Sequence, residues 1–305
     1  MKHLLHPASR RQCRMRLLLQ GSSGSGKTMS ALLVAYGLAG DWAKVAIIDS
    51  ERGSAHLYAD LGAYQVLPLT APFTPERYMD ALATCEQAGM EVIILDSITH
   101  CWEYLLDYHA SLPGNSFTAW SKVTPRHNAF VDRLLRSPAH IIATVRSKTE
   151  YALSEKNGKQ VPEKLGMKSI QRDGLDYEFS LVFELDAKHH AVASKDRTRL
   201  FVDQPPFRLG EGTGQALLEW CAAGLPAPES EDDVRQSIRL CQTLDELLAL
   251  YYRLEPAYQV ALKAEFQDQK QHLQTLSDAP SSVGNNKLFT QPSQLSTHGN
   301  LAHSA

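Results

Sequence analysis

Short apolar runs alternate with amphipathic stretches over the first two-thirds of this 305-residue chain. Apolar runs with the length of buried strands lie at residues 15–20, 44–49, 64–69, 91–96, 140–145 and 179–185. Apolar positions at helical spacing predict helices over residues 29–38, 75–88, 121–136 and 213–222. Because strands alternate with helices, we expect an α/β domain with a mainly parallel sheet and helices on both faces. Two further runs, 187–193 and 199–202, predict antiparallel edge strands.

The pattern changes after residue 224, so we expect the α/β domain to cover residues 15–224. Residues 225–233 are rich in proline and acidic side chains, which is typical of a linker. Two amphipathic stretches follow, at about 234–253 and 256–275, and together they predict a small helical hairpin over residues 234–275.

Both ends of the chain lack a periodic apolar pattern. Residues 1–14 are basic, and two interpretations stay open: a loose extension ahead of the first strand, or a start site assigned too early, with Met15 as the native start. Residues 276–305 are rich in serine, asparagine and glutamine and have few large apolar side chains, which predicts a disordered tail. We expect neither a membrane span nor a signal peptide, because no apolar run has the required length or position.

One segment matches the phosphate-binding pattern G-x-x-x-x-G-K-[ST] at every position. It reads Gly21-Ser22-Ser23-Gly24-Ser25-Gly26-Lys27-Thr28. The segment lies between an expected strand and an expected helix. Its backbone N–H groups and the N-terminus of the helix would therefore both point at a bound triphosphate, whose negative charge they attract. Lys27 is expected to reach the β- and γ-phosphates, and the Thr28 hydroxyl to bind Mg²⁺. The pattern therefore predicts a P-loop that binds ATP with Mg²⁺.

A second contact to the metal is expected from Asp96, which ends a fully apolar run. An acidic residue at this place in a P-loop protein holds Mg²⁺ beside the phosphates. Hydrolysis also needs a group that orients or deprotonates water, and Glu51 follows the strand expected after the P-loop helix. Active groups collect at the carboxyl ends of parallel strands, so Glu51 is a candidate for this role. The alternative is that Glu51 is a solvated loop residue.

Three segments resemble the RecA-like recombinase core, at residues 47–51, 93–97 and 141–148. The resemblance makes Glu51 the catalytic carboxylate and places Tyr58 where that family stacks a tyrosine on adenine. It also implies that the third segment is the strand that senses the γ-phosphate, with Thr144 and Arg146 as candidate catalytic residues. Recombinases usually carry glutamine at the position of Thr144, so we expect a different link between nucleotide and DNA.

The chain is similar, more closely, to small phage-borne RecA-core ATPases linked to single-strand annealing recombination, which are often described only as phage nucleotide-binding or AAA-family proteins. The blocks that carry this similarity lie at residues 97–102, 120–128, 146–151, 171–174 and 193–198. The similarity covers about residues 15–215, and the helical hairpin resembles a short module found behind several phage recombination proteins. The resemblance implies a cytoplasmic protein encoded by a phage or prophage, with a phage recombination or single-strand-binding protein as partner.

Lys195 and Arg197 follow an expected edge strand. They are candidates for a catalytic finger that reaches the γ-phosphate of a neighbouring subunit. Such a finger requires a homo-oligomer, either a ring or a filament. The alternative is a surface turn with ordinary ion pairs.

A lysine-rich segment follows the strand expected to sense the γ-phosphate, where the RecA-like family carries a DNA-binding loop. Its candidate DNA contacts are Lys156, Lys159, Lys164, Lys168 and Arg172. Single-strand binding needs cations along the phosphates and aromatic faces for the bases, and this segment offers mainly the cations. The alternative is a charged, solvated hairpin. The net charge of −3 excludes strong binding by bulk charge, so any DNA contact must be local.

Cysteine and histidine patterns do not indicate a metal site or a disulfide framework. The five cysteines lie far apart without a C-x-x-C pair, which is typical of reduced thiols in a cytosol. His189 and His190 are adjacent, so on a strand they face opposite sides, and we interpret both as solvated or packed side chains.

The sequence therefore predicts a Mg²⁺-dependent, RecA-like ATPase that acts on single-stranded DNA during homologous recombination or annealing. Two other functions stay open. A small-molecule kinase would need a lid with paired arginines, whereas residues 147–175 are lid-sized but rich in lysine. An ATP-dependent switch or packaging accessory would act on protein partners through the helical hairpin, with little ATP turnover. DNA-stimulated ATP hydrolysis distinguishes the three functions.

Overall fold

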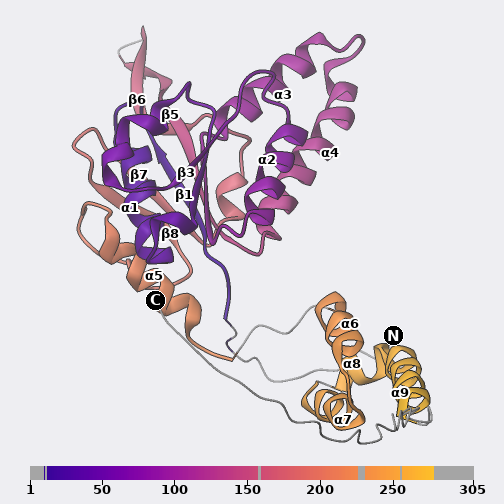
Figure 1. Ribbon diagram of the computed structural model, residues 1–305. Helices are drawn as coiled ribbons and strands as arrows, with labels where there is room; N and C mark the ends of the chain where they lie inside the picture. Colours follow the sequence, from indigo (N-terminus) through magenta and orange to yellow (C-terminus); the bar gives the residue numbers. More distant parts are fainter. Residues whose placement is uncertain (1–9, 11, 157–158, 226–230, 255, 278–305) are drawn as a thin grey trace, which may run out of the picture. The chain divides into compact units, whose positions relative to one another are not determined.

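The first part of the chain folds around one extended sheet, as the computed structural model in Figure 1 shows. The structure describes residues 10, 12–156, 159–225, 231–254 and 256–277. The chain divides into two units, Met1–Ala227 and Pro228–Ala305, and each has its own apolar core. The boundary falls inside the predicted linker 225–233, although a helix already begins at Glu231.

The sheet of the first unit has the strand order β3-β2-β4-β5-β1-β7-β8, and β6 pairs with β5 off this path. The strands are β1 (Arg16–Gly21), β2 (Val45–Asp49), β3 (Gln65–Pro68), β4 (Val92–Asp96), β5 (His140–Lys156), β6 (Lys159–Ser169), β7 (Leu181–Leu185) and β8 (Ala191–Asp196). Pairing is parallel from β3 to β7, while β8 runs antiparallel to β7 and β6 antiparallel to β5. The predicted α/β class with a mainly parallel sheet is therefore confirmed.

The helices of the first unit cover both faces of the sheet. They are α1 (Lys27–Ala39), α2 (Pro75–Gln87), α3 (Thr99–Ser111), α4 (Ser116–Leu135) and α5 (Glu211–Ala222), with short 3₁₀ turns η1 (Trp42–Lys44), η2 (Ser54–Leu61) and η3 (Leu175–Tyr177). Asn115 caps α4, because its side chain accepts a hydrogen bond from the Phe117 N–H (2.8 Å). α4 therefore begins at Ser116, ahead of the predicted start at residue 121.

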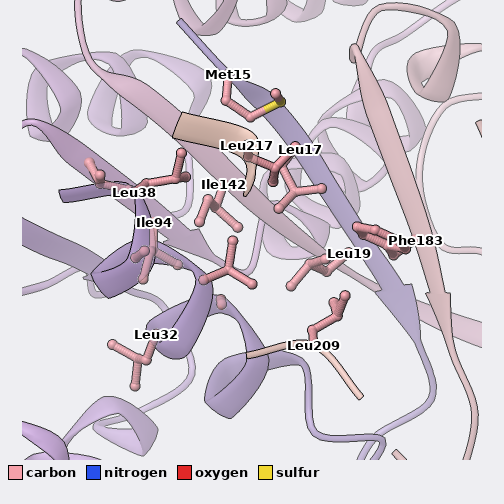
Figure 2. Packing of buried hydrophobic residues seen from close by; sticks show 14 of the residues in the cluster. Met15, Leu17, Leu19, Leu32, Leu38, Ile94, Ile142, Phe183, Leu209 and Leu217 are labelled. Carbon is pink, nitrogen blue, oxygen red and sulfur yellow. The ribbon is translucent and has the colours of Figure 1, made fainter. Parts of the chain in front are cut away.

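Side chains of each strand alternate between two apolar clusters, one on each face of the sheet. Leu17 and Leu19 of β1 belong to the cluster on the side of α1 and α5, which Figure 2 shows together with Leu32 and Leu217. Leu18 lies in the other cluster, with residues of α2 and α4. Because both faces are covered, the strands are apolar along their length, which explains the continuous apolar runs in the sequence.

α1 and α5 pack backbone to backbone at two glycines. A Cβ atom on Gly37 would lie 2.1 Å from the Glu211 carbonyl oxygen, and one on Gly214 would lie 2.2 Å from the Val34 carbonyl oxygen. Non-bonded atoms do not approach this closely, so both positions require glycine. The contact fixes α1, whose N-terminus belongs to the P-loop, against α5.

Residues 199–202 do not form the antiparallel edge strand that the sequence predicts. The edge strand is β8, and the chain then bends because the Asp196 carboxylate accepts hydrogen bonds from the backbone N–H groups of Thr198, Arg199 and Phe201. Such local side-chain contacts compete with strand pairing. β5 also runs beyond the predicted strand 140–145, into a hairpin with β6.

The end of the predicted N-terminal extension 1–14 is bound to the end of the first unit and is not loose. The Leu225 N–H donates to the Arg10 carbonyl (3.0 Å), and the Gln12 N–H donates to the Leu225 carbonyl (2.8 Å). The Cys13 N–H donates to the Cys221 carbonyl at the end of α5 (3.1 Å). Backbone pairing holds this segment, so it needs no apolar pattern of its own.

The described residues of the second unit form four helices, where the sequence predicts a hairpin of two. They are α6 (Glu231–Leu240), α7 (Leu244–Arg253), α8 (Pro256–Ala261) and α9 (Lys263–Ser277). The first predicted helix is interrupted because the Thr243 hydroxyl accepts a hydrogen bond from the Glu246 N–H (3.2 Å) and starts a new helix. Leu262 separates α8 from α9, and its side chain is buried in the core of this unit with Ile238 and Phe266.

The predicted disordered tail covers residues 276–305, and residues 278–305 of it lie outside the described residues. Residues 1–9 and 11 of the predicted extension also lie outside them. Within the described ranges, no helix has both the length and the hydropathy that crossing a bilayer requires.

Candidate nucleotide-binding site

The P-loop segment connects β1 to α1 and folds back over the N-terminus of that helix. β1 ends at Gly21 and α1 begins at Lys27, with Gly26 as its N-cap. Gly24 and Gly26 have φ angles of +78° and +86°, in the left-handed region that favours glycine. The first N–H groups of a helix have no partner within it, so the loop offers hydrogen-bond donors and a positive helix end to an anion.

Gly21 and Ser25 close the loop on itself. A Cβ atom on Gly21 would lie 2.4 Å from the Ser25 hydroxyl oxygen and 2.8 Å from the Leu185 carbonyl oxygen, so glycine is required there. The Ser25 hydroxyl is buried and has no hydrogen-bond partner in the described part of the chain. An unpaired buried hydroxyl costs free energy, and a phosphate oxygen bound in the loop would supply the missing acceptor.

Lys27 directs its ammonium group back into the loop. Nζ donates hydrogen bonds to the carbonyl oxygens of Gly21 (3.0 Å) and Ser22 (2.8 Å). Burial lowers the pKa of Lys27, and the nearby carboxylates of Asp96 and Glu51 oppose this shift. A buried cation between loop carbonyls and two carboxylates is suited to a phosphate chain, which offers it stronger charged acceptors.

Asp96 lies at the carboxyl end of β4 and joins three elements. Its two oxygens accept hydrogen bonds from the Thr28 hydroxyl on α1 (2.6 Å) and from the Thr144 hydroxyl on β5. Burial raises the pKa of Asp96, while these two hydrogen bonds act in the opposite direction. The Thr28 hydroxyl and the Asp96 carboxylate are the oxygen donors that Mg²⁺ prefers, and they already lie together.

Glu51 follows β2 and is held by partners from two other segments. The Ser97 hydroxyl donates to Oε1 (2.9 Å), and the Arg146 guanidinium forks onto both carboxylate oxygens, with Nε 2.9 Å from Oε1. Burial raises the pKa of Glu51, but the hydrogen bonds from Arg146 and Ser97 outweigh it, so the pKa lies below its ordinary value. Glu51 is therefore an ionised carboxylate with a bidentate cation attached.

The loop that carries Glu51 is shaped by two polar residues that the sequence reasoning missed. The Asp49 carboxylate accepts hydrogen bonds from the backbone N–H groups of Glu51 (2.6 Å) and Ala55 (3.0 Å). The Ser50 hydroxyl accepts from the Ser97 N–H (3.0 Å) and contacts Nδ1 of His100 (2.8 Å). An aspartate at a strand end that bonds the backbone two residues on is a common turn signal, which the sequence does show.

The P-loop, Asp96 and Glu51 all lie within the residues that match a known protein family. A comparison with known protein families matches residues 14–207 to the family described as AAA domain. The chain belongs to this family of P-loop ATPases. No curated protein matches the chain. The AAA domain thus contains every strand of the sheet, whereas α5 and the second unit lie beyond the matched residues.

Tyr58, the residue expected to stack on adenine, lies in η2 after the Glu51 loop. Its side chain is half-buried against the apolar cluster that contains α1, together with Trp42 and Tyr64. The role of Tyr58 at adenine stays a prediction.

Lys195 and Arg197 lie near the amino end of β7, whereas the P-loop of the same AAA domain lies at its carboxyl end. Lys195 pairs with Val182 at the start of β7, whereas Gly21 pairs with Leu185 at its end. Lys195 Nζ donates to the carbonyl of Asp176 (3.0 Å). Both cations are thus far from the P-loop of the same chain, and the finger stays a prediction about a neighbouring subunit.

The candidate DNA contacts lie at the end of β5, along β6 and just after β6 in the AAA domain. Residues Lys156 and Lys159 face each other at the end of this hairpin, and the side chains of these two and of Lys164 lie outside the described part of the structure. Lys168 forms an ion pair with Asp173 (3.4 Å), and Arg172 lies 3.5 Å from the Asn128 side chain.

Proposed function

We propose that this AAA-domain protein hydrolyses ATP with Mg²⁺ and acts on single-stranded DNA in homologous recombination or annealing of the phage type. One observation carries the proposal: Asp96 accepts hydrogen bonds from both Thr28 and Thr144, while Ser97, the next residue, holds Glu51. These contacts support Thr28 and Asp96 as a metal ligand pair and Glu51 as a carboxylate for water, near the P-loop lysine at the carboxyl ends of the strands.

The phosphates would be held by Lys27 and the loop N–H groups, and Mg²⁺ by Thr28 and Asp96. When bound, Mg²⁺ neutralises charge on the β- and γ-phosphates. The described residues contain no group of three or more histidine, cysteine, aspartate or glutamate side chains that could hold a metal. Mg²⁺ in such a site would use few protein ligands and complete its coordination with phosphates and water.

Glu51 is the group that takes the proton from the attacking water. Its pairing with Arg146 favours the ionised carboxylate and so reduces its basicity. Glu51 becomes a better base when Arg146 releases one of its oxygens, and Arg146 is then free to pair with the γ-phosphate. The Arg146 contact thus holds the site in a weakly active state.

DNA is proposed to stimulate hydrolysis by binding the hairpin of β5 and β6, because strand β5 connects this hairpin to the ATP site. β5 carries Thr144, which binds Asp96, then Arg146, which binds Glu51, and then enters the hairpin at the pair Ser147 and Ser169. Single-stranded DNA bound at the hairpin would therefore displace β5 and change both contacts of the site, Thr144 with Asp96 and Arg146 with Glu51.

The test is ATP hydrolysis and DNA binding by a variant in which Lys156, Lys159 and Lys164 are changed together to alanine. We expect single-stranded DNA to stimulate hydrolysis by the wild type, and the variant to lose the stimulation but keep its basal rate. Its affinity for a labelled oligonucleotide should also fall, with a flatter dependence on salt, because fewer counterions are released. The DNA proposal fails if the wild type neither binds the oligonucleotide nor responds to it.

An alternative function as an ATP-dependent switch is favoured by a groove in the second unit. Leu247, Tyr251 and Phe266 line an apolar groove of about 270 Å³, with Lys263 and Lys270 at its sides. A groove of this kind suits an apolar side chain of a protein partner. ATP binding with negligible turnover, in the presence and absence of DNA, would favour this alternative.

A further inference from the structure

The turn between β7 and β8 brings His189 against the P-loop. Nδ1 of His189 lies 3.0 Å from the point that a Cβ atom on Gly26 would occupy, and the ring carbon Cγ lies 3.5 Å from it. The side chain is otherwise exposed, so its outer edge is accessible beside the N-cap of α1. In sequence this histidine resembles an ordinary surface residue, and the fold is what brings it to the loop.

Asp186 fixes the shape of this turn. Its carboxylate accepts hydrogen bonds from the backbone N–H groups of Lys188 (2.8 Å) and His190 (2.9 Å), and its carbonyl accepts from the His189 N–H (3.1 Å). His189 has a φ angle of 67°, which is uncommon for a residue with a side chain. The turn therefore fixes the backbone of His189, whose ring lies beside Gly26.

Asp96, which would hold Mg²⁺ together with Thr28, and His189 lie on opposite sides of β1. In the sheet order β4-β5-β1-β7, Asp96 and Thr144 belong to β4 and β5, and the His189 turn follows β7. Asp96 and Thr28 would hold Mg²⁺ beside the terminal phosphates, so Asp96 would mark the γ-phosphate end of a bound nucleotide. The α-phosphate would then lie on the side of the loop away from Asp96, which is the side of His189.

We propose that His189 is a nucleotide-contacting residue that hydrogen-bonds an oxygen of the α-phosphate or the ribose. An imidazole offers one N–H donor when neutral and two when protonated, and both oxygens are acceptors. This inference rests on the proposed ATP binding. The added contact is to the α-phosphate or ribose, which ADP shares with ATP. It also gives Gly26 a second reason to be glycine, because a side chain there would displace the ring.

The test measures the affinity of a fluorescent ATP analogue and of the matching ADP analogue for four proteins. These are the wild type, His189→Gly, His190→Ala and Lys27→Ala. Glycine suits the positive φ angle at residue 189, so His189→Gly removes the ring without straining the turn. His190→Ala is the matched control, because it keeps the backbone hydrogen bond to Asp186. The His190 ring lines a cavity with Gln20, Gly21 and Glu184, whereas the side-chain atoms nearest to a Cβ atom on Gly26 all belong to His189.

We expect His189→Gly to weaken ATP and ADP binding by the same factor, about tenfold, as the loss of one hydrogen bond to a charged or polar group predicts. His190→Ala should bind as the wild type does, and the melting temperatures of both variants should match it. Unchanged binding in His189→Gly, or a loss for ATP without one for ADP, would overturn the inference. Failure of the proposed function is distinguishable, because then the wild type itself would bind no better than Lys27→Ala.

Discussion

Burial and hydrogen bonding give the two acids of the site different properties. Burial raises the pKa of Asp96, whereas hydrogen bonds from Arg146 and Ser97 outweigh burial at Glu51 and lower its pKa. The ionised form of Asp96 is thus stabilised by two hydroxyl groups, and a bound metal would stabilise it further. The ionised form of Glu51 is stabilised by Arg146, which must move away before Glu51 can act as a base.

The first prediction concerns Glu51. Glu51→Gln keeps the shape of the side chain but removes the charge that accepts a proton, so kcat should fall by roughly a hundredfold or more while ATP binding is kept. Steady-state hydrolysis and nucleotide affinity measure the two effects. Glu91→Gln, at a carboxylate paired with Lys44 on the surface, is the control and should behave as the wild type. Normal hydrolysis by Glu51→Gln would show that another group activates the water.

A second prediction at this scale concerns stability and pH. His140 is buried, and its Nδ1 accepts a hydrogen bond from the Met15 N–H (3.0 Å). Burial, together with Arg14 and Arg16, lowers the pKa of His140 to about 4. The unfolded chain takes up a proton below about pH 6.5, so this residue lowers the free energy of unfolding, by up to about 3 kcal/mol, as pH falls from about 6.5 to about 4.

His140→Gln keeps an acceptor for the Met15 N–H but cannot titrate. The fall in melting temperature between pH 7 and pH 5 should therefore be smaller in this variant than in the wild type. Equal falls in both proteins would show that His140 does not contribute to acid sensitivity.

At the scale of elements, the sequence predicts what local pattern determines. The runs that became β1, β2 and β4 each contain at least three consecutive apolar residues, and the P-loop has a fixed spacing, so each could be located without the fold. The sequence offers the hairpin of β5 and β6 only as an alternative to a DNA-binding loop. The bounds of its strands were missed, because the strands pair with each other and carry charged side chains in place of an alternating apolar pattern. α3 was missed too, since few of its side chains are buried.

The site divides in the same way. Lys27, Thr28 and Asp96 belong to short motifs, so their roles follow from sequence. The bidentate contact of Arg146 with Glu51 joins residues that are far apart in the chain, and it depends on the sheet order. The sequence named both residues as candidates but offered no sign that they pair.

A third prediction tests the packing of α1 on α5. Gly37→Ala places a Cβ atom 2.1 Å from the Glu211 carbonyl oxygen, so the two helices must separate. Overpacking of this kind costs about 1–3 kcal/mol, and the melting temperature should fall. Gly212→Ala is the matched control in α5, because a Cβ atom there meets no neighbour within 4 Å. An unchanged melting temperature in Gly37→Ala would contradict the close contact.

At the scale of the whole molecule, the AAA domain match ends at residue 207, and the second unit has a separate core. Arg197 lies near the amino end of β7, whereas its own P-loop lies at the carboxyl end. Its role therefore depends on whether copies of the chain assemble. A catalytic finger at this place requires a second copy of the chain.

The fourth prediction is that activity depends on assembly. If Lys195 or Arg197 completes a neighbouring site, the ATPase rate per chain should rise with protein concentration. Mixing Arg197→Ala with Lys27→Ala chains should restore part of the activity, because a mixed interface contains one intact set of residues. A rate per chain that is constant with concentration, without rescue in the mixture, would indicate that each chain works alone.

The central claim is that this P-loop site hydrolyses ATP with Mg²⁺. Steady-state ATP turnover by the full chain, with and without Mg²⁺ and beside Lys27→Ala, measures it most directly. We predict turnover that requires Mg²⁺ and falls at least about a hundredfold in Lys27→Ala, because the charge that develops on the phosphates loses its main cationic contact. Equal turnover in the wild type and in a folded Lys27→Ala protein would contradict the account.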